Sequence, residues 1–507
     1  MLRRLVAALL SGVALSLAFE PVAAPYVIPP AVAGFLLSVR GLRARRAWLP
    51  GLAFGVGFYF VHIWWMRAVA TAAWVALASV EALFYALLGS VVAALMTRRA
   101  WPLWCAAAWT SMEVWRSQWP FSGMPWGRLA FGVVDTPAQD ALPYVGMVGL
   151  SLLLALAGSV TAWLAVAERR RGPALALAGV VLLLLAPAVR PYHLAQSGTA
   201  TVAAVQGNVP GPGNDVLFDV RGLVANHANA TVDLAARIAA GEEPRPDLVV
   251  WPENSTATDP LGDPYTREQI DRAVAAVGVP VLVGGIVDDG PKHVLNQGIV
   301  FTPDGATSER YTKRHPVPYG EYIPFRGLID GQFGQLRAIP RDMRAGDRRT
   351  PLTIGRLSVA DAICFDVAYD DVARDQMTRG AQLMTVQTSN ATFVFTDQLD
   401  QQFAITRLRA LETGRWVVVA STNGISGVID PSGRVVQSAD KRTTAVLVQQ
   451  VGLMSGVTPG TRWGLWVGRA CLLLTAVGLL RVLLAYRRTL TGRAVVRPEP
   501  DDEGTRT

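Results

Sequence analysis

Residues 357–366 read Leu-Ser-Val-Ala-Asp-Ala-Ile-Cys-Phe-Asp, an apolar run that predicts a β-strand and closes on Cys364. The chain contains three cysteines, and the other two, Cys105 and Cys471, lie in long apolar runs that predict membrane helices. Cys364 therefore has no disulfide partner in the soluble segment that surrounds it. An unpaired thiol in an oxidising compartment needs a chemical reason, and nucleophilic catalysis is the usual one. Without other signals, a single buried cysteine is more often a small apolar side chain.

The segment around this strand, residues 191–462, alternates strand-like and helical patterns. Short apolar runs bounded by glycine, proline or polar residues predict strands, and apolar residues at helical spacing predict helices between them. Such alternation favours a layered α/β domain. The predicted strands cover residues 201–206, 248–251, 281–287, 299–301, 357–364, 383–387, 416–420 and 445–448, and the predicted helices cover about 219–240, 266–277 and 396–413.

Long apolar runs precede and follow this domain. Of the 507 residues, 51% are hydrophobic and 17% are charged, which argues against an ordinary soluble enzyme. A helix needs about 20 mostly apolar residues to cross a bilayer. The sequence therefore predicts a membrane helical bundle of about eight spans, and the polar residues 489–507 predict a disordered cytoplasmic tail. The candidate spans are 5–20, 22–39, 48–66, 68–97, 101–115, 143–167 and 172–190 within residues 1–190, and 463–485 after the soluble segment.

Arginine clusters give the expected orientation of these spans. They fall at every second loop, and the positive-inside rule places such clusters in the cytoplasm. Both termini are then cytoplasmic, and residues 191–462 lie outside the cytoplasm. The clusters are Arg3-Arg4, the group Arg40, Arg43, Arg45 and Arg46, Arg98-Arg99, Arg169-Arg170-Arg171, and Arg487-Arg488.

A second external segment, residues 116–142, is rich in aromatic residues, glycine and proline, and we name it the aromatic loop. One interpretation is an aromatic belt at the membrane interface. The other is a loop that lies on the membrane surface and shapes an opening for lipid. The aromatic residues concerned are Trp115 just before the loop, and Trp119, Phe121, Trp126 and Phe131 within it.

Two further stretches carry residues that could act together with Cys364. The run Val-Val-Trp-Pro-Glu at 249–253 places Glu253 just past an apolar strand, and a proline-stiffened loop presents Lys313 and Glu321. Side chains from distant stretches meet at strand ends in layered α/β folds, so these residues could converge. Glu253 could then take the thiol proton, Lys313 could stabilise an oxyanion, and Glu321 could orient Lys313 or close the site. The plainer interpretation is that all three are solvated loop charges.

The net charge of +8 does not indicate a nucleic-acid partner. Much of it lies in the arginine clusters beside apolar runs, which is typical of membrane proteins. No glycine-rich phosphate loop or zinc-finger spacing occurs, and the five histidines have no ligand spacing. We therefore expect no nucleic acid, no metal and no cofactor.

These stretches resemble the Glu-Lys-Cys triad of the nitrilase superfamily. The matching pieces are Trp-Pro-Glu253, the run Tyr-Thr-Lys-Arg-His-Pro-Val-Pro-Tyr-Gly-Glu at 311–321, and Ile-Cys364-Phe-Asp. With seven spans before the domain and one after it, nearly the whole chain is similar to the bacterial apolipoprotein N-acyltransferase family. The resemblance implies an α-β-β-α sandwich in which Cys364 is the nucleophile, Glu253 the general base and Lys313 the oxyanion stabiliser, with Glu321 as an accessory acid.

The same resemblance implies a multi-pass protein of the bacterial plasma membrane. Its substrates are then a phospholipid acyl donor and a diacylglyceryl-cysteine apolipoprotein, joined through a thioester on Cys364. Two alternatives stay open. One is a membrane-tethered amidase or hydrolase of nitrilase type that uses the same triad with water. The other is a non-catalytic protein that binds lipid or lipoprotein.

The sequence departs from the family pattern beside the nucleophile. The family often has Cys-Tyr-Glu where this chain has Cys364-Phe365-Asp366, and it tends to place Ala-Trp-Phe-Gly where this chain has Ala-Thr-Phe393-Val after Ser389-Asn390. Phenylalanine keeps the apolar contact but lacks the indole donor. Together with Trp126, which ends the family-like run Phe-Ser-Gly-Met-Pro-Trp at 121–126, these are the candidate substrate-binding residues. We expect the same chemistry with an altered lipid or lipoprotein pocket.

Overall fold

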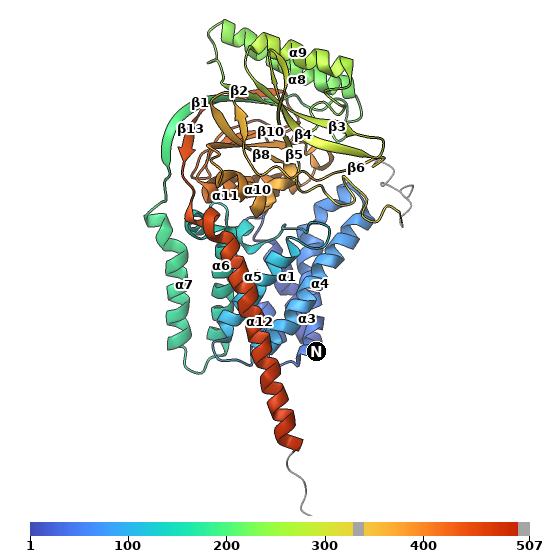
Figure 1. Ribbon diagram of the computed structural model, residues 1–507. Coiled ribbons are helices and arrows are strands. Elements are labelled where there is room, and N and C mark those ends of the chain that lie inside the picture. Colours follow the sequence, from blue (N-terminus) through green and yellow to red (C-terminus); the bar gives the residue numbers. More distant parts are fainter. Residues whose placement is uncertain (328–338, 495–507) are drawn as a thin grey trace, which may run out of the picture.

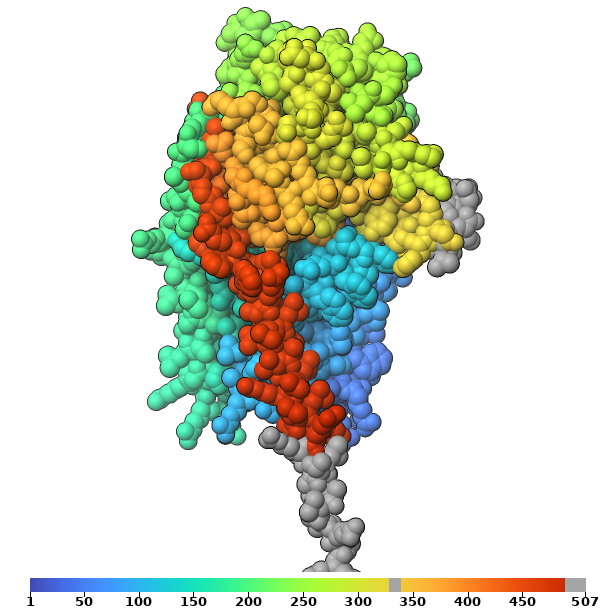
Figure 2. All heavy atoms as spheres, in the orientation of Figure 1, coloured from blue at the N-terminus to red at the C-terminus, as the bar shows by residue number. Residues whose placement is uncertain are grey.

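The computed structural model describes residues 1–327 and 339–494, and it places an α/β domain on one end of a bundle of helices (Figure 1). The chain enters the domain at β1 (Ala195–Gln206) and leaves it at β13 (Ala445–Ser455), and these two strands pair antiparallel along their length. The N-terminus lies at the end of the bundle far from the domain. The space-filling view shows the domain seated on the helices, with α12 (red) running down the outside of the bundle (Figure 2).

The helical part contains a helix at each of the eight stretches that the sequence predicts as spans. The two outermost in the sequence, α1 and α12, begin and end the described chain. Short 3-10 helices join several of them. The elements are α1 (Leu2–Ser16), η1 (Pro25–Val27), α2 (Ile28–Val39), α3 (Ala44–His62), η2 (Trp64–Ala68), α4 (Thr71–Leu95), α5 (Trp101–Arg116), η3 (Leu129–Val133), η4 (Pro137–Ala141), α6 (Leu142–Val166), α7 (Arg171–Val189) and α12 (Pro459–Ala494).

Within the described residues, four helices are long and apolar enough to cross a membrane, rather than the expected eight. They are α4, the continuous stretch Pro137–Val166 that ends in α6, α7, and residues Pro459–Arg487 of α12. One of the four helices that fall short, α3, has 19 residues but carries Arg45 and Arg46 in its first turn. The other three, α1, α2 and α5, have 15, 12 and 16 residues. At 1.5 Å per residue, each is shorter than the roughly 30 Å of a bilayer core. The chain is therefore a membrane protein. The lengths of its helices do not decide how many of them cross the bilayer completely.

Glycines let the helices of the bundle approach closely. A Cβ atom added to Gly12 of α1 would lie 2.1 Å from the Phe54 carbonyl oxygen of α3, and one added to Gly51 of α3 would lie 2.3 Å from the Tyr85 carbonyl oxygen of α4. No hydrophobic driving force acts between helices in lipid, so their association depends on close packing, which small residues at such contacts permit. These contacts hold α1, α3 and α4 together as one unit.

The α/β domain consists of two sheets that pack face to face. The first has the order β13-β1-β2-β3-β4-β5 with β6 beside β4, and the second has the order β12-β11-β10-β9-β8-β7. All the strands predicted from the sequence are present, and short edge strands are added to them. The remaining bounds are β2 (Leu248–Val250), β3 (Val281–Asp289), β4 (His293–Thr302), β5 (Gly305–Thr312), β6 (Asp342–Met343), β7 (Leu352–Ile354), β8 (Leu357–Ile363), β9 (Leu383–Thr388), β10 (Val417–Ser421), β11 (Gly427–Ile429) and β12 (Val435–Ser438).

Helices cover the outer faces of the two sheets. The pair α8 (Val220–Ala239) and α9 (Pro264–Val277) lies on the side away from the bundle, and α10 (Asp370–Met377) and α11 (Gln398–Thr413) face the bundle (Figure 1). The central strands pair in parallel: β1 with β2 and β2 with β3 in one sheet, and β8 with β9 and β9 with β10 in the other. Parallel strands buried on both faces are typical of α/β layers. The architecture is thus the expected α-β-β-α sandwich.

The last helix differs from the expected span at both ends. It begins at Pro459, before the expected start at 463, because Gly460 packs directly against the Leu142 carbonyl of α6. It continues past 485 to Ala494, so residues 489–494, expected in the disordered tail, are helical. The run Leu483-Leu-Ala-Tyr-Arg-Arg is made of residues compatible with a helix, and nothing in it ends one. Residues 495–507 of the expected tail lie outside the described residues.

Candidate active site

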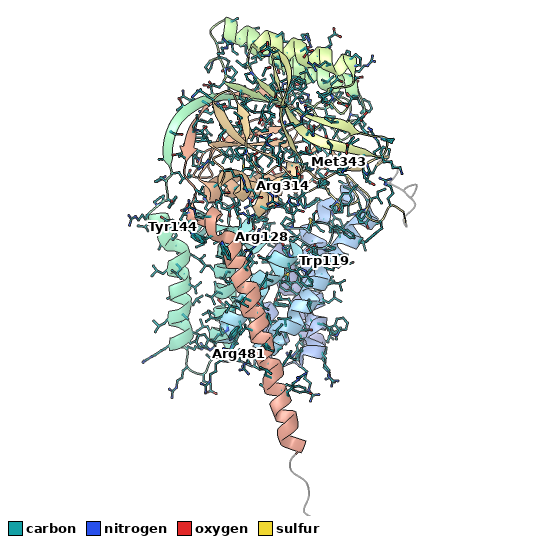
Figure 3. All side chains as sticks on the ribbon, in the orientation of Figure 1. Trp119, Arg128, Tyr144, Arg314, Met343 and Arg481 are labelled. Atoms are coloured by element: carbon teal, nitrogen blue, oxygen red, sulfur yellow. The ribbon has the colours of Figure 1, made fainter. Side chains whose placement is uncertain are left out.

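Three sequence-distant residues meet at the end of the α/β domain that faces the helices. Lys313 follows the last residue of β5, Cys364 follows the last residue of β8, and Glu253 lies three residues past β2. Figure 3 labels Arg314, the neighbour of Lys313, at the boundary between the domain and the bundle. The predicted convergence of strand ends therefore occurs.

Lys313 lies between two carboxylates. Its Nζ is 3.1 Å from Oε1 of Glu253 and 2.6 Å from Oε1 of Glu321. Burial alone would lower the pKa of the Lys313 ammonium, but the charges of Glu253 and Glu321 outweigh it and raise that pKa well above its ordinary value. An ammonium has three donors, so two carboxylates leave one N–H for a further acceptor.

Glu253 is held by donors that the sequence did not reveal. Its Oε1 also accepts a hydrogen bond from Nδ2 of Asn296 at 2.8 Å, and its Oε2 accepts one from the backbone N–H of Ser389 at 2.9 Å. Asn296 comes from β4 and Ser389 follows β9, so both sheets fix this carboxylate. The polar pair Asn296-Gln297, which stands between the apolar residues of β4, was the available signal.

Glu321 anchors the loop that carries the lysine. Its second oxygen, Oε2, accepts the Val317 backbone N–H at 2.8 Å. Burial raises the pKa of Glu321, and the charge of Glu253 adds to this, although Lys313 acts in the opposite direction. The side chain stays 15% exposed, against 1% for Lys313. Of the acidic groups around the lysine, Glu321 is thus the one nearest to solvent.

Cys364 lies at a strained turn rather than inside the predicted strand. The strand ends at Ile363, and Cys364 begins a 3-10 helix with a φ of 53°. Left-handed backbone is costly for a residue with a Cβ, and such residues concentrate at functional sites. Asn254 and Asn390, which follow Glu253 and Ser389, have φ values of 55° and 55°. The turn presents Sγ beyond the edge of the sheet.

The thiol of Cys364 is neutral in its surroundings. Burial, reinforced by the charge of Glu253, raises the pKa of this thiol to about 12, although Lys313 acts in the opposite direction. Its described hydrogen-bond contact is a weak one to Oε1 of Gln402 at 3.8 Å. At pH 7 a pKa of about 12 leaves roughly one thiol in 10⁵ ionised. The thiol therefore needs a neighbouring base in order to act as a nucleophile.

The Asp366 carboxylate accepts hydrogen bonds from the segment that carries Lys313, residues 311–321, which we name the lysine loop. It accepts them from the Tyr311 hydroxyl at 2.8 Å and from the backbone N–H groups of Arg314 at 3.1 Å and His315 at 2.9 Å. The residue is fully buried. Asp366 therefore fixes both sides of Lys313 relative to the Cys364 turn, and its part in substrate binding stays a prediction.

The other three candidate binding residues gather in one aromatic cluster, made of Trp65, Trp126, Phe365 and Phe393. Trp126 stacks on Phe365 with ring centroids 5.5 Å apart. Trp65 packs edge-on against Trp126 at 5.7 Å and against Phe393 at 5.3 Å. Trp65 belongs to η2 in the bundle and was not predicted as a site residue. The cluster forms an apolar surface beside the turn that carries Cys364.

Gln401 of α11 ties this cluster to the bundle. Its Oε1 accepts the indole N–H groups of Trp126 at 2.7 Å and Trp65 at 2.9 Å. Its Nε2 donates to the backbone carbonyls of Glu20 at 2.9 Å and His62 at 3.2 Å. A single amide thus joins the α/β domain, the aromatic loop and the bundle.

A buried ion pair inside the bundle holds the aromatic loop. Arg116 Nη1 lies 3.2 Å from Oε2 of Glu81, and the two side chains are 0% and 2% exposed. The same nitrogen donates to the backbone carbonyls of Met124 at 2.6 Å and Trp126 at 2.8 Å. The Tyr59 hydroxyl also donates to the Trp126 carbonyl, at 3.0 Å. These bonds fix Trp126 where it meets Phe365.

Aromatic residues in and beside the aromatic loop differ in their exposure. Trp126 is 1% exposed and belongs to the junction with the α/β domain, whereas Trp115 and Trp119 are 41% and 56% exposed and stack on each other at 5.6 Å. The exposed pair has the character of an interfacial belt. Trp126 has the character of a wall of the site.

Two family models match consecutive parts of the chain. The model described as the apolipoprotein N-acyltransferase N-terminal domain matches residues 11–160, and the one described as carbon-nitrogen hydrolase matches residues 201–455. The second match agrees with the sandwich. The class of protein is therefore a carbon-nitrogen hydrolase domain carried on membrane helices.

Curated relatives match almost the whole chain. The apolipoprotein N-acyltransferase of Mycolicibacterium smegmatis is 34% identical over 97% of this chain and 87% of that relative. Those of Pseudomonas aeruginosa and Nitrosomonas europaea are each 30% identical, over 94% and 96% of this chain and 96% and 99% of their own lengths. The chain therefore belongs to the apolipoprotein N-acyltransferase family. Among solved structures, the NitFhit protein of C. elegans is 19% identical over 51% of this chain and 62% of its own, with a TM-score of 0.38, which is too weak to add to this assignment.

Proposed function

We propose that this membrane enzyme moves an acyl chain from a phospholipid to the N-terminal amine of diacylglyceryl-cysteine lipoproteins, through a thioester on Cys364. The name shared by the relatives sets the reaction class, an acyltransferase that acts on apolipoproteins. The observation that carries the mechanism is the single position of Lys313, between the Glu253 and Glu321 carboxylates and beside the Cys364 turn.

In the first half of the reaction, Glu253 takes the proton from Sγ of Cys364, and Sγ attacks the ester carbonyl carbon of the phospholipid. The oxyanion that forms is stabilised by the Lys313 ammonium, through the N–H that its carboxylates leave free. The ester C–O bond then breaks, and the departing lysophospholipid oxygen takes the proton from Glu253. An acyl thioester remains on Cys364.

In the second half, the α-amine of the lipoprotein attacks the thioester carbonyl. Lys313 again faces the oxyanion, and Glu253 accepts a proton from the amine. When the C–S bond breaks, that proton passes to Sγ and restores the thiol. The product carries the acyl chain in amide linkage, and the enzyme returns to its starting state.

Trp126, Phe365 and Phe393 form the wall for the acyl chain in this proposal. All three belong to the aromatic cluster beside Cys364, and an acyl chain is apolar. Asp366 contributes indirectly, because it holds the lysine loop.

The orientation proposed from the sequence agrees with the positions of the arginine clusters. Residues 3–4 lie at the start of α1, and residues 40–46, 98–99 and 169–171 lie at or beside the turns that join helices; all are at the end of the bundle away from the α/β domain (Figure 1). We therefore place that end, with both termini, in the cytoplasm and the catalytic domain outside the plasma membrane, with eight helices in the bundle. A thiol reagent that cannot cross membranes should label Cys364 in intact spheroplasts, and labelling only after lysis would reverse the orientation.

The order of the two halves separates this function from a hydrolase. With phospholipid and no acceptor, the purified enzyme should release a stoichiometric burst of lysophospholipid and then stop until a diacylglyceryl-cysteine peptide is added. Continuous release of free fatty acid without acceptor would identify a hydrolase. No release, together with unchanged function of Cys364→Ala, would identify a binding protein.

A further inference from the structure

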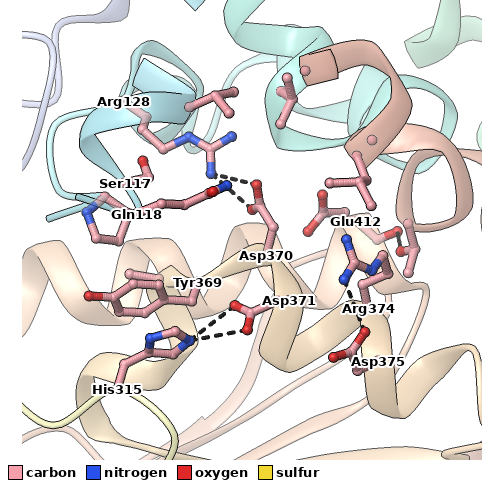
Figure 4. A pocket seen from close by; sticks show the side chains of 18 of the residues that line it. Ser117, Gln118, Arg128, His315, Tyr369, Asp370, Asp371, Arg374, Asp375 and Glu412 are labelled. Carbon is pink, nitrogen blue, oxygen red and sulfur yellow. Dashed lines mark hydrogen bonds and ion pairs between the residues drawn. The ribbon is translucent and has the colours of Figure 1, made fainter. Parts of the chain in front are cut away.

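A cavity of about 390 Å³ lies between the α/β domain and the bundle, separate from the cysteine (Figure 4). Its walls come from the aromatic loop, α10, and the helices α5, α6 and α12. Neither Cys364, Lys313, Glu253 nor Glu321 lines it. Ala368, at the far end of the 3-10 helix that Cys364 begins, is part of its wall, as are Arg314 and His315, which follow Lys313. The volume falls in the range of small-molecule sites.

The domain side of the cavity carries more positive than negative charge. Four guanidinium groups lie within 4 Å of the Asp375 carboxylate, from Arg314 at 3.1 Å, Arg349 at 3.8 Å, Arg374 at 3.0 Å and Arg379 at 3.9 Å. Arg314 also pairs with Asp371. Of these arginines, Arg314, Arg349 and Arg374 line the cavity together with Asp371 and Asp375, which leaves a surplus of one formal charge on this side.

The remaining charges around the cavity balance. Asp370 pairs with Arg128 at 2.8 Å and with Arg409 at 2.8 Å, and Arg409 also pairs with Glu412. These are two arginines for two carboxylates. Figure 4 shows Arg128 and Asp370 joined on one side of the cavity and Arg374 reaching Asp375 on the other. The surplus positive charge therefore lies on the side of the cavity that Arg349 and Arg374 line.

Arg349 and Arg374 have donors to spare. Arg349 is 64% exposed, and its described contact is the distant one to Asp375. Arg374 is 23% exposed and uses Nη2 on Asp375 at 3.0 Å. A guanidinium has five N–H donors in a planar fork that matches a phosphate.

The bundle side of the cavity is apolar and open toward α12. Val114, Val148 and Leu465 line it, and a Cβ atom added to Gly464 would meet no atom within 4 Å. Figure 2 shows α12 (red) beside the cyan aromatic-loop region, directly below the orange part of the α/β domain. Beyond the cavity, α12 exposes Leu472 and Leu473 at 41% and 66%. Charged donors above an apolar wall match an amphipathic ligand with a phosphate at one end.

We propose that this cavity binds the phosphate headgroup of a phospholipid that is not the acyl donor, with its acyl chains lying along α12. The phosphate lies against Arg349 and Arg374, and the glycerol region occupies the space beside Gly464. Of the proposed function, this binding requires only that the helices cross a bilayer. Such a lipid fills the seam between the domain and the bundle.

The test measures lipid binding in full-length protein that carries Cys364→Ala, so that no acyl transfer consumes the lipid. Delipidated protein in detergent is titrated with phosphatidylglycerol and followed by native mass spectrometry. Arg349→Ala with Arg374→Ala should weaken binding about thirtyfold, since each arginine near an anionic lipid headgroup contributes roughly a factor of five. Gly464→Leu, which keeps every charge and fills open space, should weaken it as well. The matched control, Arg237→Ala with Arg272→Ala on the outer helices α8 and α9, should bind like the parent.

Three results would overturn the proposal. Unchanged binding in both cavity variants removes the site. A second contradicting result has three parts: the protein binds inorganic phosphate alone, the arginine variant loses that binding, and Gly464→Leu does not change lipid binding. The cavity would then be an anion site and not a lipid site. With Cys364 restored, the arginine variant should form the thioester at the parent rate. A fall in that rate parallel to the loss of lipid would make the cavity the path of the donor, whereas failure of the proposed function itself would abolish the thioester in parent and variant alike.

Discussion

Among the buried cations of this molecule that lie next to carboxylates, one from each half, Lys313 and Arg116, differ in their other partners. In the α/β domain, Lys313 contacts the carboxylates of Glu253 and Glu321. In the bundle, Arg116 contacts Glu81 and also two backbone carbonyls of the aromatic loop. Both cations are fully buried, so neither pair can be explained as a surface charge.

The difference between the two pairs indicates a division of labour. A lysine ammonium is a compact charge that keeps one donor for a developing oxyanion, whereas the planar guanidinium bridges several fixed acceptors at once. Lys313 is therefore suited to the reaction, and Arg116 is suited to holding Trp126 against Phe365. Removing either should reduce activity, but for different reasons and by different amounts.

Glu253→Gln should have the largest effect, because the neutral amide cannot accept the thiol proton. We expect thioester formation to fall by about 10²–10⁴-fold. The rate is measured from the mass of the acylated protein after mixing with phospholipid. Glu243→Gln, in an exposed pair with Arg237, is the matched control. A fall of less than threefold would assign the base to another residue.

Lys313→Arg should reduce the same rate by about 10²–10³-fold, although the positive charge is retained. The larger guanidinium cannot keep the position between Glu253 and Glu321 and also face the oxyanion. Lys441→Arg, in the exposed pair with Asp400, provides the control. If Lys313→Arg were as active as its control, the lysine would be a structural counter-ion only.

Arg116→Met leaves Glu81 buried without its partner, and removal of one member of a buried pair destabilises a protein by about 3–5 kcal/mol. The thermal midpoint in detergent should fall accordingly. Glu81→Leu combined with Arg116→Met should restore the midpoint. The double variant should still form the thioester about ten- to a hundredfold more slowly, since the loop carbonyls stay unbound and Trp126 loses its position. Recovery of both stability and rate would show that the pair does not position the loop.

Trp126→Phe keeps the aromatic stack and removes the indole donor to Gln401. Loss of one such hydrogen bond should lower the rate about fivefold, and it should change KM for phospholipid more than kcat. Trp119→Phe is the matched variant on the same loop, because Trp119 is exposed (Figure 3). Equal effects of the two substitutions would remove Trp126 from the substrate wall.

Asp361 contrasts with the carboxylates beside Lys313 and Arg116, because it is buried and forms no ion pair among the described residues. Burial raises its pKa to about 7, and nearby Asp366 adds to this. A raised carboxyl pKa means that stability is full below pH 4 and declines as pH rises toward 7. Asp361→Asn should therefore leave activity unchanged and stabilise the protein by up to about 4 kcal/mol more at pH 8 than at pH 4. Thermal midpoints at the two pH values give the measurement, and a pH-independent difference would show that Asp361 is ionised throughout.

Local patterns in the sequence were sufficient for much of this account. Apolar length located the eight helices. An apolar strand run just before Glu253 and another that closes on Cys364 located the edge at which the candidate site residues meet. The strand β5, with the sequence Gly-Ala-Thr-Ser-Glu-Arg-Tyr-Thr, was not predicted because its polar residues pair at the edge of a sheet that only tertiary structure defines. The sequence therefore did not show that Lys313 directly follows a strand, although the loop that carries Lys313 was recognised.

Other parts of the site depend on contacts between distant segments. Asn296 and Ser389 reach Glu253 from two different sheets, and Gln401 reaches Trp65 across 336 positions of the chain. Glu81 did carry a signal, because an acidic residue inside an apolar span is costly and needs a partner. That signal predicts a buried cation, yet the sequence does not say that Arg116 is the partner or that the pair holds the aromatic loop.

The most direct test of the account is the mass of the peptide that contains Cys364, after the purified protein has been incubated with phospholipid and without acceptor. The account predicts an added acyl mass that neutral hydroxylamine removes and that Cys364→Ala lacks. An unmodified Cys364 peptide, from a preparation that still acylates a lipoprotein peptide when both substrates are present, would contradict the thioester and with it the proposed roles of Glu253 and Lys313.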